Sequence, residues 1–461
     1  MRLKLMVTLT LLLFIAPLLV GFGGVIAPAF SWLPVLGLQQ LSFNGWLQML
    51  AWPGLSHSLL LTLFTGLGST LLALCWCFII LKQCWHSQYW FKIERLLVPV
   101  LAMPHVAFVL GLVLTFSANG WLARILHHLG FSQHLYPSVI HDSYGIGLLL
   151  TLAIKETPFL LLMSMAVLQQ LNIKQLQQVA ASLGYNPQQT WFRLILPLWL
   201  PKLRLAIYAV TGYSLAVVDV ALIIGPNQPS TFAVLVWQWF NEPNLELLPR
   251  AAAGAMLLLL LTAAIIILLR FIEWLLISYC NQWQYRGVTA NVKIHNKTGS
   301  NHRIAIKLSQ ALLLFPLLML PTLAIWSVAQ RWRFPDLFPS RYSWRFWQQQ
   351  LEPLQSLMTN SLILALISSL SAIILAIVCL EYRQKYQRGL SPWLITVPMI
   401  APQISLLFGM QTLIYTLPGQ HYWLWLSWSH WLYVFPYVYL ALDGAWRSYD
   451  VRLDQTARSL A

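Results

Sequence analysis

Long apolar runs dominate the chain, and short polar stretches separate them. Most runs are about 20 residues long, which is the length that a helix needs to cross the roughly 30 Å hydrocarbon core of a bilayer. They lie at residues 5–26, 55–81, 96–117, 144–168, 203–224, 251–277, 305–328, 358–380, 391–417 and 423–442. The pattern predicts an all-α polytopic membrane protein with about ten transmembrane helices.

Composition and charge support this interpretation and give it an orientation. Only 9% of the 461 residues are charged and 58% are hydrophobic, whereas a soluble domain carries roughly 25% charged residues. About 20 basic residues fall on one side of the predicted spans and about 6 on the other, so the positive-inside rule places the N-terminus in the cytosol. Basic loops beside anionic lipid headgroups account for the net charge of +15 without nucleic acid.

A polar stretch at residues 281–304 predicts a cytosolic linker between two repeats. The first repeat, residues 1–280, contains six predicted spans, and the second, residues 305–461, contains four. Because an even number of spans precedes the linker, both repeats begin on the cytosolic side. This arrangement favours a direct repeat.

Three pairs of motifs support the duplication. They are Pro104 and Gly111 with Pro402 and Gly409, residues 157–160 with residues 435–438, and residues 178–184 with residues 455–461. The last pair, QVAASLG and QTARSLA, is polar and stands at the same cytosolic end of corresponding helices. Apolar composition alone does not place the same polar residues there, so we expect two related halves.

The most informative segment is the predicted cytosolic loop at residues 171–201, which contains the first heptapeptide. Small side chains at Ala180 and Ala181 allow a short helix to pack closely against a partner, and Gly184 can supply the positive φ that ends such a helix. Pro197 then favours the start of a new helix just before a membrane span. We expect this loop to pass the motion of a docked partner to the membrane helices.

The loop resembles the hallmark of the permease subunits of binding-protein-dependent ABC importers, which is Glu-Ala-Ala, three residues, Gly, nine residues and Ile-x-Leu-Pro. The matching residues are Gln178, Val179, Ala180, Gly184, Leu194, Leu196 and Pro197. Both spacings are kept, while Gln replaces Glu, Val replaces Ala and Leu replaces Ile. In the resembled family this loop is the coupling helix, which docks into a groove of the ATP-hydrolysing subunit.

The resemblance implies a type I importer fold, similar to the fused permeases of the thiamine type and the ferric-ion type, in which one polypeptide supplies both halves of the pathway. It also implies a bacterial inner-membrane location, a small-molecule or ion substrate delivered by a periplasmic binding protein, and two copies of a separate ABC ATPase. The sequence contains no GxxxxGK[ST] phosphate loop, so ATP is expected on the partner subunit. The chain itself is expected to hold no cofactor and to be no enzyme.

The second coupling loop is incomplete in the sequence. Gln455, Thr456 and Ala457 take the Glu-Ala-Ala positions, and Ala461 takes the position of the family glycine. We expect the sequence to be a fragment of a chain that continues with the rest of this loop and two further spans. The alternative is a permease that works with one coupling site.

Three ionisable residues within the predicted spans are candidates for the translocation path or gate. They are Lys155, Glu156 and Asp219. An acidic residue on the path would suit a cationic solute. The alternative for all three is a structural role. Lys155 and Glu156 would then pair with other helices or with backbone freed by Pro158.

An external loop collects the side chains that most often bind metals. They are His127, His128, His134, His141 and Asp142. Their spacing fits no established zinc pattern, and polar external loops collect histidines readily, so we expect no metal site.

Two other functions stay open. A secondary transporter driven by an ion gradient needs buried carboxylates, and Glu156 and Asp219 are the acidic residues that lie clearly within the predicted spans. In such a transporter the cytosolic loop would have no purpose. A membrane-embedded enzyme needs acids, His or Ser at catalytic spacing, but the sequence contains no HExxH or GxSxG motif. The solute itself is not specified by the sequence.

Overall fold

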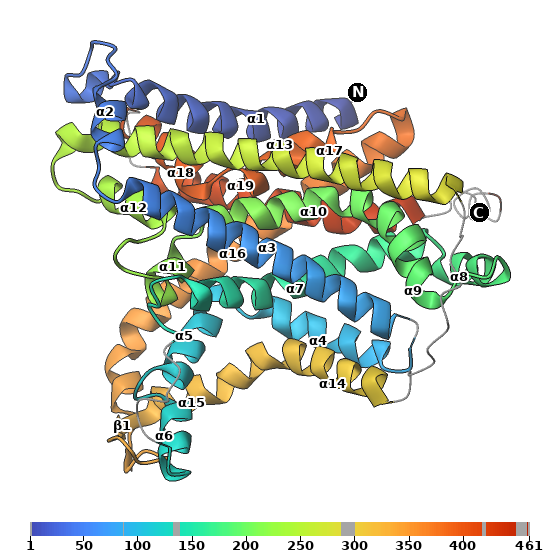
Figure 1. The fold of residues 1–461 in the computed structure, drawn as a ribbon. Helices are drawn as coiled ribbons and strands as arrows, with labels where there is room; N and C mark the ends of the chain where they lie inside the picture. The colour runs from blue at the N-terminus through green and yellow to red at the C-terminus, as the bar shows by residue number, and fades with distance from the viewer. Residues whose placement is uncertain are drawn as a thin grey trace.

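The computed structural model describes residues 2–85, 87–131, 139–286, 300–416, 421–448 and 459. Within these ranges the fold is built from helices, together with one short antiparallel hairpin of β1 (Ala329–Arg331) and β2 (Arg341–Tyr342) (Figure 1). The predicted all-α polytopic fold is confirmed.

The helices before residue 287 form the first half of the chain. They are α1 (Arg2–Ala29), α2 (Asn44–Leu50), α3 (Leu55–Cys84), α4 (Trp90–Ala102), α5 (His105–Phe116), α6 (Trp121–His128), α7 (Ile146–Gln170), α8 (Ile173–Ser182), α9 (Pro187–Gln189), α10 (Leu196–Ala216), α11 (Asp219–Ile224), α12 (Phe232–Phe240) and α13 (Leu248–Arg286). Short turns of other helix types are η1 (Pro34–Leu36), the π-helical η3 (Thr190–Ile195) and η4 (Leu245–Leu247).

The helices from residue 300 onward form the second half. They are α14 (Ser300–Leu314), α15 (Met319–Val328), α16 (Arg345–Tyr386), α17 (Pro392–Ile400), α18 (Gln403–Thr416) and α19 (Tyr422–Ser448), with the short turn η5 (Phe315–Leu318) between α14 and α15. α13 and α14 enter the predicted linker from its two sides, and residues 287–299 lie outside the described ranges.

Eight helices in the described ranges are long and apolar enough to cross a membrane, and the bent pair Trp393–Ile400 and Gln403–Gln411 makes a ninth if it counts as one span. The tenth predicted span, residues 423–442, forms α19, which is 27 residues long. It is long enough but not apolar enough to be counted with these helices, because Trp, Tyr, Ser and His occupy many of its positions. It packs against α16 and α17.

Proline breaks the corresponding predicted spans of the two halves. α4 and α5 are separated by Met103 and Pro104, and α17 and α18 by Ala401 and Pro402, with extended backbone at the residue before each proline. A proline disfavours helical geometry in the residue before it and has no N–H to donate. The first pair of repeat motifs therefore marks the same structural feature in each half.

The first predicted span of each half, residues 5–26 and residues 305–328, packs on the proline-broken span of the other half. α1 lies along α18, and α15 lies along α5. A Cβ atom on Gly409 of α18 would overlap the Gly21 carbonyl of α1. A Cβ atom on Gly111 of α5 would lie 2.5 Å from the Cβ atom of Met319 in α15. The two glycines of the paired motifs therefore each allow a close approach between the halves.

The two ends of the helix bundle carry different elements. Figure 1 shows α8 and α9 at one end, near the start of α1, and α2 and α12 at the opposite end. We call these the α8 end and the α2 end. α10 starts at the α8 end, where it follows η3, and runs toward the α2 end.

Candidate functional site

The predicted coupling loop, called the α8 loop below, folds as a short helix followed by a tight reversal. The backbone N–H of Gly184 donates to the Ala181 carbonyl at 3.0 Å. The N–H of Tyr185 donates to the Ala180 carbonyl, also at 3.0 Å. These two bonds form a Schellman motif, which requires a residue in the left-handed region. Gly184 supplies it with φ +83°, and no atom of the described chain lies within 4 Å of its ideal Cβ position.

A capped turn then leads the chain back toward the membrane. The Asn186 side chain accepts a hydrogen bond from the Gln189 N–H at 2.8 Å, and the Gln189 side chain accepts one from the Asn186 N–H at 3.0 Å. This reciprocal capping box starts α9. η3 follows and continues directly into α10, with Pro197 buried in the first turn of α10. The direction of the turn is therefore fixed at both of its ends.

Aromatic packing anchors this return turn to α3. Trp191 in η3 and Trp199 in α10 are buried, and their rings lie 5.9 Å and 5.8 Å from the ring of Phe78 in α3. Leu194 and Leu196 of the motif are partly buried in the same stretch. The return turn of the α8 loop is thus packed on α3 and continuous with α10.

The outer face of α8 carries an exposed apolar pair. Val179 is 58% exposed and Leu183 is 69% exposed, and positions four apart lie on one helix face. Gln178 and Ala181 are also exposed, while Ala180 is buried. Val179 belongs to the predicted coupling motif, whereas Leu183 was not predicted as a site residue, although the spacing of four is visible in the sequence.

The partial second copy of the motif stays a prediction. Gln455, Thr456, Ala457 and Ala461 lie outside the described residues. The helix that leads toward them, α19, contains Pro436, as α7 contains Pro158 at the paired position.

A cavity of ≈ 1020 Å³ lies between the two halves. α10, α11 and α12 of the first half line one side, and α17, α18 and α19 of the second half line the other. Leu33 and Leu36, between α1 and α2, and Asn241, after α12, also line it. Because these connecting segments lie at the α2 end, the cavity extends toward that end.

Close packing of α10 on α17 borders the cavity on the side of the α8 end. Gly212 lines the cavity, and a Cβ atom there would lie 2.9 Å from the carbonyl carbon of Ile400. One turn nearer the start of α10, the Tyr208 ring lies 5.9 Å from the Trp393 ring. In this structure the cavity therefore reaches toward the α2 end and has a packed floor toward the α8 end.

Asp219 stands on the wall of this cavity. α10 ends at Ala216 and α11 begins at Asp219, because the extended backbone of Val217 interrupts the helix. Asp219 is exposed and lines the cavity. Within the described part of the chain, no hydrogen bond or ion pair involves its carboxylate.

Comparison with known proteins identifies the family. No family model matches the chain. The chain is 30% identical over 424 residues to the inner membrane ABC transporter permease protein YnjC of Escherichia coli strain K12, and the match covers 91% of this chain and 74% of that protein. The chain belongs to the ABC transporter permease family. The prediction of an ABC transporter permease with several membrane helices in the inner membrane is thereby confirmed.

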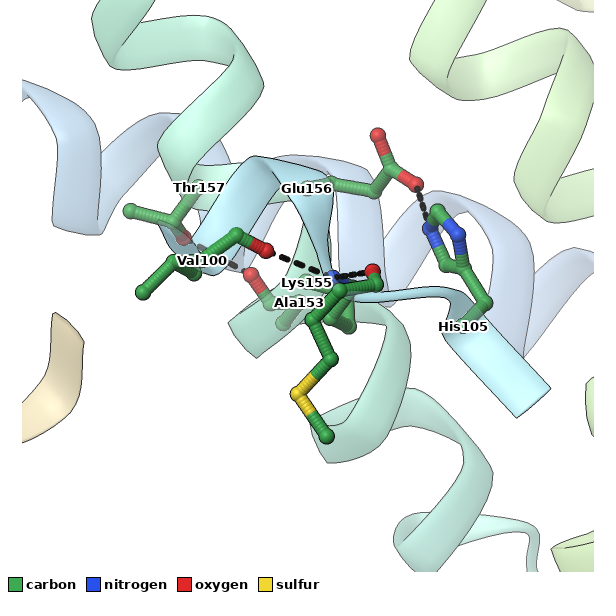
Figure 2. Close-up of polar contacts among 7 residues, drawn as sticks. Val100, His105, Ala153, Lys155, Glu156 and Thr157 are labelled. Carbon is green, nitrogen blue, oxygen red and sulfur yellow. Dashed lines mark hydrogen bonds and ion pairs between the residues drawn. The ribbon is translucent and has the colours of Figure 1, made fainter. Parts of the chain in front are cut away.

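Lys155 of the permease stabilises a helix break and is not among the residues that line the cavity. It is 4% exposed in α7, and its ammonium group donates to the carbonyls of Val100 at 3.0 Å and Met103 at 2.7 Å (Figure 2). Pro104 has no N–H, so the Val100 carbonyl lacks its usual helical donor. Lys155 replaces that donor at the α4–α5 break, whereas sequence analysis considered backbone freed by Pro158.

Lys155→Met is expected to destabilise the permease by about 2–4 kcal/mol, less than the sum of two charged hydrogen bonds because the variant no longer buries an ammonium group. Two buried carbonyls would lose a charged donor, and hydrogen bonds to charged groups contribute roughly 1.5–3 kcal/mol each. Thermal unfolding of the detergent-purified variant measures the effect. The matched control is Lys307→Met, at an exposed position of α14, which should unfold like the wild type. Equal stability of the two variants would contradict this role.

Glu156 does not line the cavity, but one intermediate residue connects it to the cavity wall. It is 6% exposed, and its carboxylate pairs with Nε2 of His105 at 3.2 Å (Figure 2). The His105 ring lies 5.1 Å from the ring of Tyr213, which lines the cavity. Glu156 therefore supports the cavity wall through His105 and Tyr213.

A further buried carboxylate, that of Glu273, lies within the predicted span 251–277 and was not predicted as buried. This carboxylate accepts hydrogen bonds from the Arg204 guanidinium at 2.8 Å and 2.7 Å and pairs with Arg270 at 3.1 Å. The statement that two acidic residues lie clearly within the spans was therefore wrong. Because Glu273 is paired with two arginines, its charge is compensated inside the fold.

Two members of the predicted external histidine cluster, His141 and Asp142, have hydrogen-bond partners in the fold. Nδ1 of His141 lies 2.6 Å from the Gly225 carbonyl, and Asp142 accepts hydrogen bonds from two N–H groups at the start of α7. His134 lies outside the described residues. In the parts of the chain that are described, no group of three or more His, Cys, Asp or Glu could hold a metal ion. The absence of a metal site stays a prediction.

Proposed function

We propose that this permease is the membrane subunit of an ATP-driven importer and that its α8 loop docks onto a separate ABC ATPase in the cytosol. The observation that carries the proposal is the α8 loop, which exposes Val179 and Leu183 while its return turn is anchored to α3 and α10. An exposed apolar pair on one face of a short helix suits insertion into a groove of a partner. On this proposal the N-terminus, near the α8 end, is cytosolic.

A stiff connection is what such coupling requires. The Schellman turn at Gly184 and the capping box at Asn186 leave few free backbone bonds between α8 and α10. The buried rings of Trp191 and Trp199 resist bending of the return turn. Closure of the ATPase subunits would therefore displace α3 and α10 rather than deform the loop.

The cavity between the halves is the proposed translocation path. On this orientation its α2 end faces the periplasm, where a solute-binding protein delivers a small molecule or ion. Separation of α10 from α17 would open the floor toward the cytosol, which gives alternating access. ATP is bound by the partner subunits, and the permease chain holds no cofactor. Two ATPase copies are proposed, one for each coupling motif.

Docking is tested by making the exposed pair polar. The double variant Val179→Ser and Leu183→Ser should reduce recovery of the ATPase with the permease by at least about tenfold, because burial of each apolar side chain contributes roughly 1.5–3 kcal/mol. The measurement is co-purification after co-expression with the ABC ATPases of the source organism, each carrying a tag.

The amount of inserted, folded permease is compared in the same preparations, and a second variant serves as the control. Leu129→Ser changes an equally exposed leucine after α6, away from α8, and should leave co-purification unchanged. The proposal fails if the ATPase is recovered equally with the double variant and with the wild type.

A further inference from the structure

We propose that the cavity binds an organic cation, with Asp219 as the counter-charge and aromatic rings from both halves as the contact surface. This inference rests on the proposed function, since it assigns the class of solute that occupies the proposed path. It is argued from the charge, the rings and the volume of the cavity.

The charge of the cavity is negative. Asp219 is exposed to it, while the lining drawn from the described residues contains no Lys, Arg or His. No hydrogen bond or ion pair within the described chain involves the Asp219 carboxylate. A carboxylate in an apolar, membrane-embedded wall is costly without a partner. A cationic solute would supply that partner, and an anionic solute would meet repulsion with no compensating base.

Aromatic rings make up a large share of the wall. Tyr213 and Trp237 come from the first half, and Tyr433 and Tyr437 from the second. Trp237 and Tyr437 are exposed, so their rings are accessible to a bound molecule. The face of an aromatic ring attracts a cation, and sites for quaternary ammonium groups are built from such rings.

Phe240 and Phe408 join the two halves at the cavity. Both line it, and their rings stack with centroids 3.7 Å apart. Phe240 ends α12 and Phe408 lies in α18. A solute that contacts this stack touches both halves at once, so its binding is sensitive to their relative position.

The wall suits an organic cation better than a metal ion. Metal ions in proteins bind through several oxygen, nitrogen or sulfur ligands, and Asp219 is the one acidic side chain in the described lining. No group of three metal-binding side chains occurs among the described residues. A volume of ≈ 1020 Å³ is that of a site for an organic molecule.

Binding to the purified full-length permease tests the inference without transport. The probe is benzyltrimethylammonium, with benzyl alcohol as the neutral comparison and phenylacetate as the anionic one, each followed by equilibrium dialysis. The wild type should bind the cation at least about tenfold more tightly than the other two. Asp219→Asn should lower the affinity for the cation by about tenfold or more and leave the neutral probe unchanged.

Three further variants test whether binding of the cation depends on the cavity wall. Glu246→Gln removes a charge from an exposed site outside the described lining and should not change binding of the cation. Tyr433→Phe, which keeps the ring, should bind like the wild type, whereas Tyr433→Leu should bind several-fold more weakly. Equal binding of all three probes, tighter binding of phenylacetate, no binding of the cation, or an unchanged affinity in Asp219→Asn would overturn the inference.

The outcome is distinguishable from a failure of the proposed function. Loss of cation selectivity in a permease that still binds the ATPase through Val179 and Leu183 would reject the organic-cation class and leave the importer proposal intact. Selective cation binding in a permease that does not bind the ATPase would reject the coupling proposal and support the cavity assignment.

Discussion

Gly184→Val is expected to abolish ATP-driven uptake and to reduce binding of the ATPase at least about tenfold, while the protein still inserts in the membrane. Gly184 has φ +83° at the turn that ends α8. A β-branched residue in that region costs roughly 1–3 kcal/mol. No described atom lies near the ideal Cβ position, so the cost comes from the backbone and not from a clash. The Schellman turn would open, and α8 would lose its fixed orientation.

The control for this prediction uses the same position. Asn tolerates the left-handed region far better than Val does, and its side chain also has space there. Gly184→Asn should therefore retain most of the uptake and ATPase binding. Uptake and co-purification are compared at equal amounts of inserted protein. Similar activity of the Asn and Val variants would show that the turn at residue 184 does not govern coupling.

Gly212→Ala should lower uptake about tenfold and destabilise the permease. The expected change in stability is opposite in sign to the usual effect of replacing Gly by Ala in a helix. Ala normally stabilises a helix interior by about 1 kcal/mol relative to Gly. At Gly212 the added Cβ would overlap the carbonyl group of Ile400, and such overpacking costs typically 1–3 kcal/mol. α10 and α17 would be forced apart, so the floor of the cavity would not close.

A second glycine in a helix provides the matched change. A Cβ atom at Gly444 in α19 would meet an Ala166 methyl at 3.7 Å, an ordinary contact. Gly444→Ala should leave uptake and thermal stability unchanged or slightly raised. If Gly212→Ala behaved like Gly444→Ala in both assays, close packing of α10 on α17 would not be needed for closure.

The sequence predicts the membrane helices well because each requires a long apolar run, and all ten predicted runs fall on described helices. Internal breaks are harder to predict. Pro104 and Pro402 lie at two of these breaks and belong to the repeat motifs, but the breaks themselves were not predicted. The residues on both sides of each break are apolar, so hydropathy does not reveal where one helix ends and the next begins. The break at Val217 carries no proline or glycine signal. The structure shows it as the extended backbone of Val217 between α10 and α11.

The α8 loop was predictable in detail because its signals are local. Gly184 and Pro197 each act within a few residues of their own position, as does Asn186, whose capping role was not predicted. The role of Lys155 was not predictable, because its partners at Val100 and Met103 are more than fifty residues away in the chain. The packing of α1 on α18 and of α15 on α5 was not predictable for the same reason, because it depends on long-range contacts at Gly21 and Met319.

The orientation and docking of α8 can be tested in one measurement. Val179→Cys is prepared in a chain that also carries Cys75→Ser and Cys280→Ser, because these two native cysteines are not fully buried. Membrane vesicles of each orientation are then treated with a membrane-impermeant thiol reagent. We expect labelling at residue 179 only from the cytosolic side, and protection from it when the ATPase is co-expressed. Labelling from the periplasmic side, or equal labelling with and without the ATPase, would contradict the assignment of α8 as the coupling helix.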